Sequence, residues 1–475
     1  MSNAPIVFTI EEIENRTQRI DVAFFNPVYQ KTMDELKRIA NNKDRKVEDL
    51  DFFLKKISPT HLTGGATPRG AVYVEDGVKF LRIQNIRENE IRLDKCVRIV
   101  PEIHERELKR SQLKQDDVLL TITGSYGLAA VVSKDIGETN INQHIVKIEL
   151  DQSKITPQYL SFYLNSELSR SQMDRAVTGS SRLALDYSSI RALKIACPIE
   201  LTEQEKITKE ITTLRMEANS KLSQAKELAT SDQDYILNEL NLALPNIPSI
   251  NTFSVDAGLL LNRFDAIAHN PRYHELLIAL EKGNYKPKPL VNFASLGHKM
   301  ITPAESSPLE QFKLVELEDI DGELGIISRF REYHGIQIKG GKLKFEKGQL
   351  LISRLRFYLR KVAIVNEDLI NGVGSGEFYT LDCKEDVDAF FLKTMLRQQL
   401  VLIQAEAKST GSSRPRLTKE DIQSLMIPDV PFPIQRKIGQ KIIQDLKMIK
   451  KLRGEARELT AQAKKKIDEF LRNAS

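Results

Sequence analysis

The sequence is poor in the features that would place it outside the cell or in a membrane. It has no Trp and only three cysteines, Cys96, Cys197 and Cys383, which lie far apart. An odd number of widely spaced cysteines indicates neither a disulfide framework nor a Cys-based zinc site, so we expect reduced, structural thiols. No apolar run approaches the length of a membrane-spanning helix, and Met1–Asn15 lacks the basic start and apolar run of a secretory signal. These absences predict a cytoplasmic protein.

Motifs of known catalytic centres are also missing. The chain contains no phosphate-binding loop of the form G-x-x-x-x-G-K-[ST], and its seven histidines form no H-E-x-x-H pattern or other metal spacing. No base can be identified for the serines of its Gly-Ser turns, and no cluster of acids with a lysine indicates a nuclease. The sequence therefore predicts a binding protein with no catalytic residue, no metal site and no cofactor of its own.

What the sequence does contain is an internal repeat. The pentapeptide TGSSR occurs at Thr178–Arg182 and again at Thr410–Arg414, each time before a short apolar run that leads into a long charged helix. Other pairs recur in the same order: Arg19–Tyr29 with Arg263–Tyr273, Phe80–Ile86 with Leu314–Ile320, Val118–Thr121 with Leu350–Ser353, and Gln204 with Gln435. Ordered matches of this kind indicate two homologous halves. The length of 475 residues also calls for at least two domains.

Within each half the pattern is mixed α and β. Helical spacing of apolar residues follows Pro27 and Pro271, and helices are predicted again over 157–173 and 388–404. Between them, short apolar runs separated by Gly, Asn and Asp predict strands. These runs are VKFLRI, DVLLTI, AAVV and IVKIEL in the first half, and FKLVEL, QLLIS, KVAIV and FYTLD in the second. After each TGSSR turn we predict a short helix and an apolar stretch closed by proline.

A long helix is predicted after each half, because apolar residues recur there every three or four positions. The first stripe comprises Ile207, Ile211, Leu214, Ala218, Leu222, Ala225 and Leu228. The second comprises Ile438, Ile442, Leu446, Ile449, Leu452, Ala456, Leu459, Ala463, Ile467 and Phe470. We expect the two stripes to pack against each other; the alternative is that each helix lies on its own globular unit. Asn241–Asn251, which contains Pro245 and Pro248, is the predicted linker between the halves.

The TGSSR turns are the best candidates for a binding surface, because their backbone N–H groups, hydroxyls and arginine are the groups that hold phosphates. The side chains concerned are Ser180, Ser181, Arg182, Ser412, Ser413 and Arg414, with Arg416 and Lys419 nearby. Thr123–Gly127 (TGSYG) and Arg354–Arg360 (RLRFYLR) follow matched strands but differ in sequence, as expected of one frame that carries two different readers. The second of these could instead be an amphipathic edge strand. The basic segment 433–475 is either a solvated helix face or a surface near DNA or an acidic partner.

Asn26–Tyr29 (NPVY) and Asn270–Tyr273 (NPRY) differ by one residue from the Asn-Pro-Pro-Tyr with which amino-methyltransferases hold a flipped adenine. The second proline is missing in both copies, and no Gly-rich loop for S-adenosylmethionine follows a strand. We therefore interpret each copy as a helix start, with Asn as the cap and Pro at the first helical position.

The doubled order of a Gly-Ser turn, an apolar run to proline, Gln204 or Gln435, and a long helix resembles the specificity subunits of type I restriction-modification systems. The resemblance covers nearly the whole chain, although Ile434 stands where a Glu usually precedes the second Gln. It implies an α+β fold of two homologous mixed α/β target-recognition domains, joined by two long antiparallel coiled-coil helices with a pseudo-two-fold. We predict the domains at 1–200 and at 245–432, the latter including the linker, and the long helices at 201–244 and 433–475.

The resemblance further implies a non-catalytic subunit that reads a split DNA site, one half-site per domain, with the helices setting the distance between half-sites. It implies a methyltransferase subunit in two copies, docked on the helices, and a restriction and translocase subunit. S-adenosylmethionine, ATP and Mg would bind to those partners. The implied base readers are Arg82, Gln84, Asn85, Glu316, Glu318 and Asp319, and further implied DNA contacts in the loops are Ser125, Tyr126, Arg354, Arg356 and Arg360.

Two other functions fit the same sequence. One is the DNA-recognition subunit of a type IIB or stand-alone modification system. The other is a coiled-coil scaffold that binds protein and not DNA.

Overall fold

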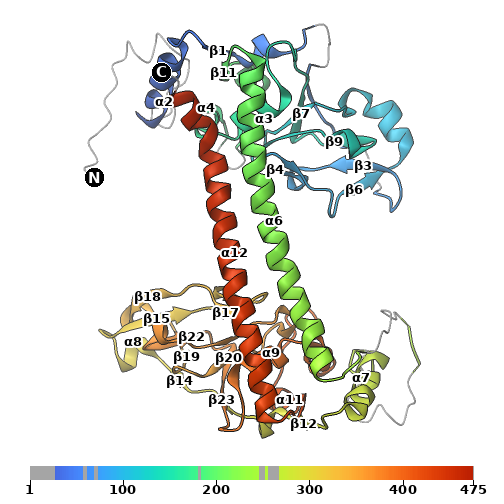
Figure 1. Ribbon diagram of the computed structural model, residues 1–475, viewed down its shortest axis with the longest axis vertical. Helices are drawn as coiled ribbons and strands as arrows, with labels where there is room; N and C mark the ends of the chain where they lie inside the picture. Colours follow the sequence, from blue (N-terminus) through green and yellow to red (C-terminus); the bar gives the residue numbers. More distant parts are fainter. Residues whose placement is uncertain are drawn as a thin grey trace. The chain divides into compact units, whose positions relative to one another are not determined.

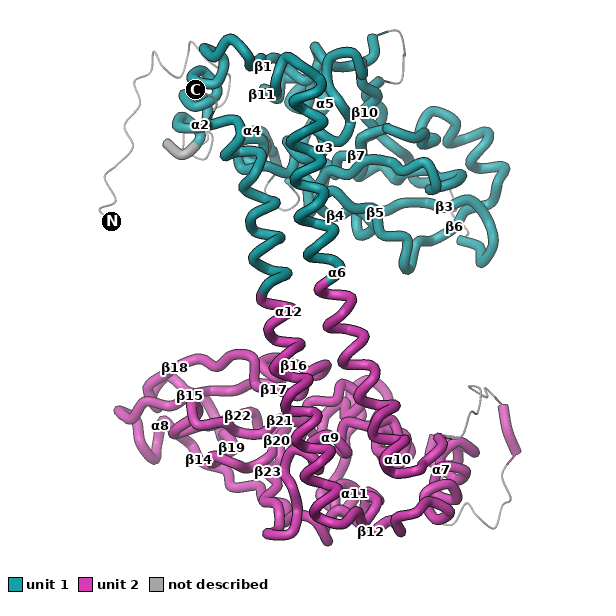
Figure 2. Tube along the Cα trace, in the orientation of Figure 1, with its two compact units in different colours: residues 1–220, 455–475 teal, residues 221–454 magenta. Residues whose placement is uncertain are grey.

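A computed structural model describes residues 27–56, 61–68, 73–179, 183–244, 252–254 and 267–473. The chain forms two compact units (Figure 2): residues 1–220 with 455–475 make unit 1, and residues 221–454 make unit 2. The two long helices, α6 (Leu201–Glu239) and α12 (Phe432–Arg472), are each divided between the units. Each unit therefore combines a globular part with one segment of each long helix.

The described residues of unit 1 form two sheets of three or more strands. The first has the strand order β2 (Leu62–Gly64), β10 (Ile145–Ile148), β7 (Val118–Thr121) and β8 (Ala129–Val131), and all its pairs are antiparallel. The second has the order β6 (Val97–Ile99), β3 (Val78–Leu81) and β9 (Thr139–Ile141), with β3 and β9 parallel. Two ribbons complete the unit: β1 (Arg45–Asp49) with β11 (Lys194–Pro198), and β4 (Ile86–Arg87) with β5 (Glu90–Ile91).

Unit 2 repeats this topology. Its first sheet has the equivalent order β13 (Ala294–Gly297), β23 (Phe378–Cys383), β20 (Leu350–Ser353) and β21 (Val362–Ile364). Its second sheet has two added strands and the order β14 (Met300–Ile301), β19 (Lys342–Lys344), β22 (Gly372–Gly374), β15 (Gln311–Val315) and β18 (Arg331–His334). The ribbons are β12 (Pro287–Pro289) with β24 (Met426–Pro428), and β16 (Ile320–Asp321) with β17 (Ile326–Ile327). The shared order confirms the two homologous halves and the predicted strands.

The helices agree with the prediction except at one point in each half. α2 (Pro27–Ala40) and α7 (Pro271–Lys282) begin at the predicted prolines, and α5 (Tyr187–Arg191) and α11 (Lys419–Gln423) follow the TGSSR turns. The stretches predicted to be helical, 157–173 and 388–404, are each interrupted once. The first is α3 (Pro157–Leu164) and α4 (Glu167–Ala176), and the second is α9 (Ala389–Leu396) and α10 (Gln399–Lys408). In unit 1 the break has a clear cause, because Ser166 caps α4 by accepting a hydrogen bond from Ser169 N at 3.3 Å.

The second NPxY motif is a helix start, as interpreted. The Asn270 side chain accepts a hydrogen bond from Arg272 N at 3.0 Å, and Pro271 occupies the first turn of α7. Asn26 of the first copy lies outside the described residues. Asn241, with φ of 48°, ends the turn after α6, as a linker start requires, and most of the predicted linker is likewise not described.

The long helices pack on each other antiparallel and also on the globular parts. In unit 2, Ala225 of α6 and Ile449 of α12 share a buried cluster, and Glu239 near the end of α6 pairs with Lys437 near the start of α12 at 2.7 Å. In unit 1, Ile207 of α6 and Ile467 of α12 enter the core of the globular part. The expected packing of α6 on α12 is therefore present (Figure 1), together with the packing on the globular parts that was the alternative. Leu222 was misplaced in the stripe, since its relative exposure is 45%.

A buried glutamine fastens the start of each long helix. In unit 1 the amide of Gln204 accepts from Thr156 N at 2.9 Å and donates to Pro198 O at 3.0 Å. In unit 2 the amide of Gln435 accepts from Asp388 N at 2.9 Å and donates to Val430 O at 2.8 Å. Each glutamine thus joins the end of the last strand to the start of the helix pair, which explains its recurrence in the sequence. No described helix is long and apolar enough to cross a membrane.

Candidate nucleic-acid interface

The TGSSR turns have the same backbone frame in both units. In unit 2, Thr410 N donates to Arg416 O at 3.0 Å and Arg416 N donates to Thr410 O at 2.9 Å. In unit 1, Thr178 forms the same bridge with Ala184. Gly179 and Gly411 have φ of 105° and 98°, values that favour glycine at this point of the turn. The tip of the second turn, Ser412 to Arg414, is exposed, whereas Ser180, Ser181 and Arg182 lie outside the described residues.

Each turn lies beside the loop that follows the central strand β7 or β20. Thr123 bridges to Ala184 in unit 1, and Leu355 bridges to Arg416 in unit 2. The segment Arg354–Arg360 is not the edge strand that was one alternative: it contains a 3₁₀ turn at Phe357–Leu359, between Arg356 and Arg360 with φ of 48° and 56°. The segment is therefore a loop that lies next to the TGSSR turn, and its role as a reader stays a prediction.

Two of the loop side chains predicted to contact DNA differ in accessibility. Tyr126 is buried, and its hydroxyl donates to Asp174 Oδ1 at 2.8 Å. Burial, followed by the hydrogen bond to Asp174, raises the pKa of Tyr126 to about 12. Ser125 is exposed. Tyr126 therefore supports the loop from inside, which corrects its prediction as a contact, and Ser125 stays a candidate.

The basic residues of unit 2 divide into held and exposed groups. Glu377 accepts from Arg354 Nε at 3.0 Å and from Arg416 Nη2 at 2.7 Å, and these two partners, Arg416 first, lower the pKa of its carboxyl. Arg356 Nη2 donates to Ser413 O at 3.2 Å, which ties the loop to the turn. Arg360, half-buried, donates to Gln399 Oε1 at 3.5 Å. The side chains of Arg414 and Lys419 are exposed and have no partner among the described residues, so they are the strongest candidates for phosphate contacts.

The predicted base readers lie on a capped 3₁₀ turn that is repeated in both units. In unit 1 the Asn85 side chain accepts from Arg82 N at 3.0 Å, and in unit 2 the Asp319 side chain accepts from Glu316 N at 2.8 Å. Asn85 and Asp319 have relative exposures of 1% and 0%. Their prediction as base contacts was wrong, because their side chains turn back to cap the backbone. Gln84 and Glu318, one position earlier, are exposed at equivalent points.

The remaining predicted readers are half-buried. Arg82 lies over the Tyr73 ring, 5.8 Å from its centroid, and Glu316 pairs with Lys342 at 2.7 Å. Each capped turn lies next to the loop that follows the central strand. In unit 1 the side chain of Ile83 contacts the loop at Gly124, with Cδ1 3.8 Å from the position that a Cβ would occupy there. In unit 2 Lys361 Nζ, at the end of the loop, donates to Ile320 O at 3.1 Å. In each unit the capped turn, the loop and the described residues of the TGSSR turn thus lie next to one another, and we call them the tip surface.

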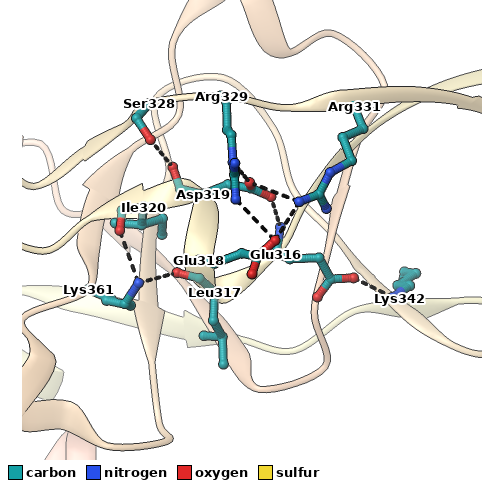
Figure 3. A network of polar contacts seen from close by, with 10 residues as sticks. All are labelled: Glu316, Leu317, Glu318, Asp319, Ile320, Ser328, Arg329, Arg331, Lys342 and Lys361. Atoms are coloured by element: carbon teal, nitrogen blue, oxygen red, sulfur yellow. Dashed lines mark hydrogen bonds and ion pairs between the residues drawn. The ribbon is translucent and has the colours of Figure 1, made fainter. Parts of the chain in front are cut away.

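Sequence reasoning missed Arg329 and Arg331, which meet the capped turn of unit 2 (Figure 3). Arg329 donates to Asp319 and Glu318, and Arg331 donates to the same two carboxylates. Arg331 begins β18, and Arg329 lies two residues before that strand, so the alternate spacing of the two arginines was the available signal. Among the described residues no group of His, Cys, Asp and Glu side chains could hold a metal ion.

A duplicated α+β unit that carries an exposed polar tip surface at the same point of its fold defines a two-module binding protein. The family model described as "Type I restriction modification DNA specificity domain" matches residues 52–227 and 318–460, and the chain belongs to this family. The match confirms the resemblance inferred from the repeated motifs.

Individual relatives are distant. The chain is 26% identical over 147 residues to the type I restriction enzyme EcoBI specificity subunit of Escherichia coli, and the aligned stretch spans 31% of this chain but only 30% of that relative. A structure described as showing complex assembly and conformational transition of the type I R-M system is similar with a TM-score of 0.50 and 14% identity, over 91% of this chain and 99% of that one. The type I restriction-modification S subunit from M. genitalium matches with a TM-score of 0.46 and 14% identity, over 91% and 96% of the two chains.

Proposed function

We propose that this chain is the DNA-binding specificity subunit of a type I restriction-modification complex and reads a split site, one half-site per unit. One observation carries the proposal: the two tip surfaces share a frame but expose different side chains at equivalent points, Gln84 in unit 1 and Glu318 in unit 2. A shared frame suits a common duplex geometry. Different side chains suit different base sequences, because each base pair presents its own pattern of donors and acceptors in the major groove.

The second TGSSR turn would hold the phosphate backbone beside the bases. Arg414, Lys419 and the hydroxyls of Ser412 and Ser413 are exposed there, and such groups fix the register of a protein on DNA without reading its sequence. Binding through them would weaken with salt, because each neutralised phosphate releases counterions. Ser180, Ser181 and Arg182 of the first turn would do the same for the other half-site.

We infer that the partners and cofactors divide as the family resemblance implies. The target-recognition domains would be 1–200 and 245–432, and the helices at 201–244 and 433–475 would dock the methyltransferase, in two copies, with the restriction subunit beyond it. Exposed Lys447, Lys465 and Arg457 give α12 a charged outer face suited to such docking. S-adenosylmethionine, ATP and Mg would be bound by the partners, catalysis would take place there, and the complex would act on DNA in the cytoplasm.

The test is to map N6-methyladenine in a genome that carries this chain and its methyltransferase. We expect a bipartite motif with an undefined spacer. Replacing residues 19–199 with the matching part of a relative should change one half of the motif and leave the other half intact. A change in both halves would refute the modular reading, and methylation indifferent to sequence would refute the proposal as a whole.

Methylation mapping, copurification and DNA-binding measurements distinguish two alternative functions. A type IIB or stand-alone modification system would give the bipartite motif but a different set of copurifying subunits. A protein scaffold would give no binding to a split DNA site at any salt concentration.

A further inference from the structure

The capped turn of unit 2 differs from that of unit 1 at one buried position. Asn85 and Asp319 occupy equivalent places: each accepts a hydrogen bond from the backbone N–H three residues earlier. Each also accepts a backbone bond at its own carbonyl, from Arg92 N at 2.7 Å and from Ser328 N at 2.8 Å. The turns are therefore superimposable in their backbone bonding, and the amide has been exchanged for a carboxylate.

The exchange changes what the buried side chain can bind. The amide of Asn85 donates from Nδ2 to Arg92 O at 2.9 Å, which closes the turn internally. An ionised carboxylate has no donor, so Asp319 cannot close its turn in this way. In unit 2 the hydroxyl of Ser328 donates instead to the backbone carbonyl of Asp319 at 2.8 Å. Asp319 Oδ1 instead accepts from Arg329 Nε at 2.5 Å and from Arg331 Nη2 at 3.5 Å. The buried group thus binds two guanidinium groups.

Those guanidinium groups belong to side chains at the surface. The Asp319 side chain is 0% exposed, whereas Arg329 and Arg331 are 57% and 36% exposed. Glu318, which is 64% exposed, accepts from Arg329 Nη2 at 3.1 Å and from Arg331 Nη2 at 2.5 Å, so each arginine is held by two carboxylates (Figure 3). A fully buried carboxylate must keep such partners, because leaving it unpaired is costly.

Part of each guanidinium remains available to a ligand. Within the residues that the structure describes, hydrogen bonds occupy Nε and Nη2 of Arg329 and only Nη2 of Arg331. The pair also adjoins the rest of the tip surface, because Lys361, which follows the loop Arg354–Arg360, donates to the turn at Ile320 O. In unit 1 the residues after Arg92 are Leu93, Asp94 and Lys95, so this arginine pair has no counterpart there.

We propose that Arg329 and Arg331 determine the specificity of unit 2 by binding a guanine in the major groove of the second half-site, and that Asp319 is their positioning residue. Arginine pairs with guanine O6 and N7 through two parallel donors, which requires the guanidinium to be held in one orientation. Asp319 and Glu318 supply that orientation before DNA binds, so less side-chain entropy is lost on binding. This inference rests on the proposed function, since it names the base class that the same surface reads.

The experiment uses the full chain in complex with its methyltransferase and measures binding to duplexes in which each base pair of the second half-site is replaced in turn. For Arg331→Ala we expect discrimination at one G·C pair to fall by about 10- to 100-fold. Asp319→Asn should reduce discrimination at the same pair by a smaller factor and add little in an Arg329→Ala, Arg331→Ala background, because the residues act as a unit. Discrimination at the base pairs of the first half-site should be unchanged in all these variants.

Controls separate this result from damage to the fold and from failure of the proposed function. Asp319→Asn should retain the unfolding midpoint, because Asn85 shows that the same turn accepts an asparagine. Lys347→Ala removes a cation paired with Glu367 before β20, at the opposite end of that strand from the tip surface, and should leave base preference unchanged. A uniform loss of affinity for all duplexes in the arginine variants would overturn the inference while the proposed function stands. A wild-type complex without sequence preference would overturn both.

Discussion

A buried lysine in unit 2 gives a prediction that can be worked out in detail. Lys393 of α9 has a relative exposure of 1%. Burial, together with the positive charges of Arg397 and Lys450, lowers its pKa from 10.5 to about 7, although Asp232 opposes the shift. The folded state therefore disfavours the charged ammonium. A difference of this size corresponds to on the order of 5 kcal/mol of stability that unit 2 loses when the lysine is protonated.

The pH dependence follows from the direction of the shift. Between the folded pKa of about 7 and the unfolded value of 10.5, the unfolded chain binds more protons, so stability rises with pH across that window. Below about pH 7 the penalty is complete. Lys393→Met keeps the length of the side chain and removes its charge, so it should stabilise unit 2 by up to about 5 kcal/mol at pH 6 and by about 1 kcal/mol at pH 10.

The assay must distinguish the two compact units, because proteins with more than one unit do not in general unfold in one all-or-none transition. Hydrogen exchange of backbone amides in α9 and α10, measured at pH 6 and, after correction for the intrinsic rate, at higher pH, reports the opening free energy of unit 2. Exposed Lys384, in the same unit, is the matched control: Lys384→Met should change stability by less than about 0.5 kcal/mol at every pH. A destabilised Lys393→Met variant at pH 6, or a stabilisation that does not decline with pH, would refute the reasoning.

Three further predictions concern α6, α12 and the second turn. Gln435→Ala leaves Asp388 N and Val430 O without the partner they have now, so unit 2 should lose about 2–4 kcal/mol in denaturant unfolding, whereas Gln440→Ala on the exposed face of α12 should have little effect. Burial, followed by the neighbouring Asp445, raises the pKa of Asp232 from 3.8 to about 7. Between these two pH values the folded state binds more protons than the unfolded chain, so stability falls as pH rises. Asp232→Asn should therefore stabilise the protein above pH 7 but not near pH 4. Unfolding curves at the two pH values check this. Arg414→Ala should weaken DNA binding equally for all sequences, and a salt titration should show the slope of log K against log[salt] reduced by about one counterion. A loss of affinity confined to particular base sequences would contradict its role as a phosphate contact.

Much of the frame could be predicted from the sequence because the duplication allowed each pattern to be checked twice. Apolar runs such as those at β7 and β20 are buried on both faces, so they stand out against the polar turns on either side. The Gly-Ser turns were also found because they occur twice. Gly179 and Gly411 have backbone conformations that favour glycine, which explains why both copies contain it. Apolar spacing alone could not place Leu222 correctly, because a residue at the edge of a helical stripe can still face solvent.

The site could be predicted only in part, because the chemical type of a side chain does not say which way it points. Asn85 and Asp319 have the groups that read bases, yet both turn inward to cap the backbone. Arg329 was overlooked because its contribution depends on Asp319, which is distant enough in sequence that no local spacing links them. The 3₁₀ turn in Arg354–Arg360 depends on two arginines with positive φ, a conformation that no propensity favours for this residue.

The division of α12 between the units has a consequence for how the protein is made. Ala463, Ile467 and Leu471 belong to the core of unit 1, and Asp468 accepts a hydrogen bond from Glu167 N at 3.0 Å at the start of α4. A ribosome that has finished the first half of the chain has therefore not yet supplied the residues that complete its core. Unit 1 must wait, partly assembled, until the segment after Glu455 emerges, whereas all of unit 2 has been synthesised by then. The module that is translated first is the last to be completed, and a nascent chain that ends at residue 454 would have all the residues of unit 2 but an incomplete unit 1.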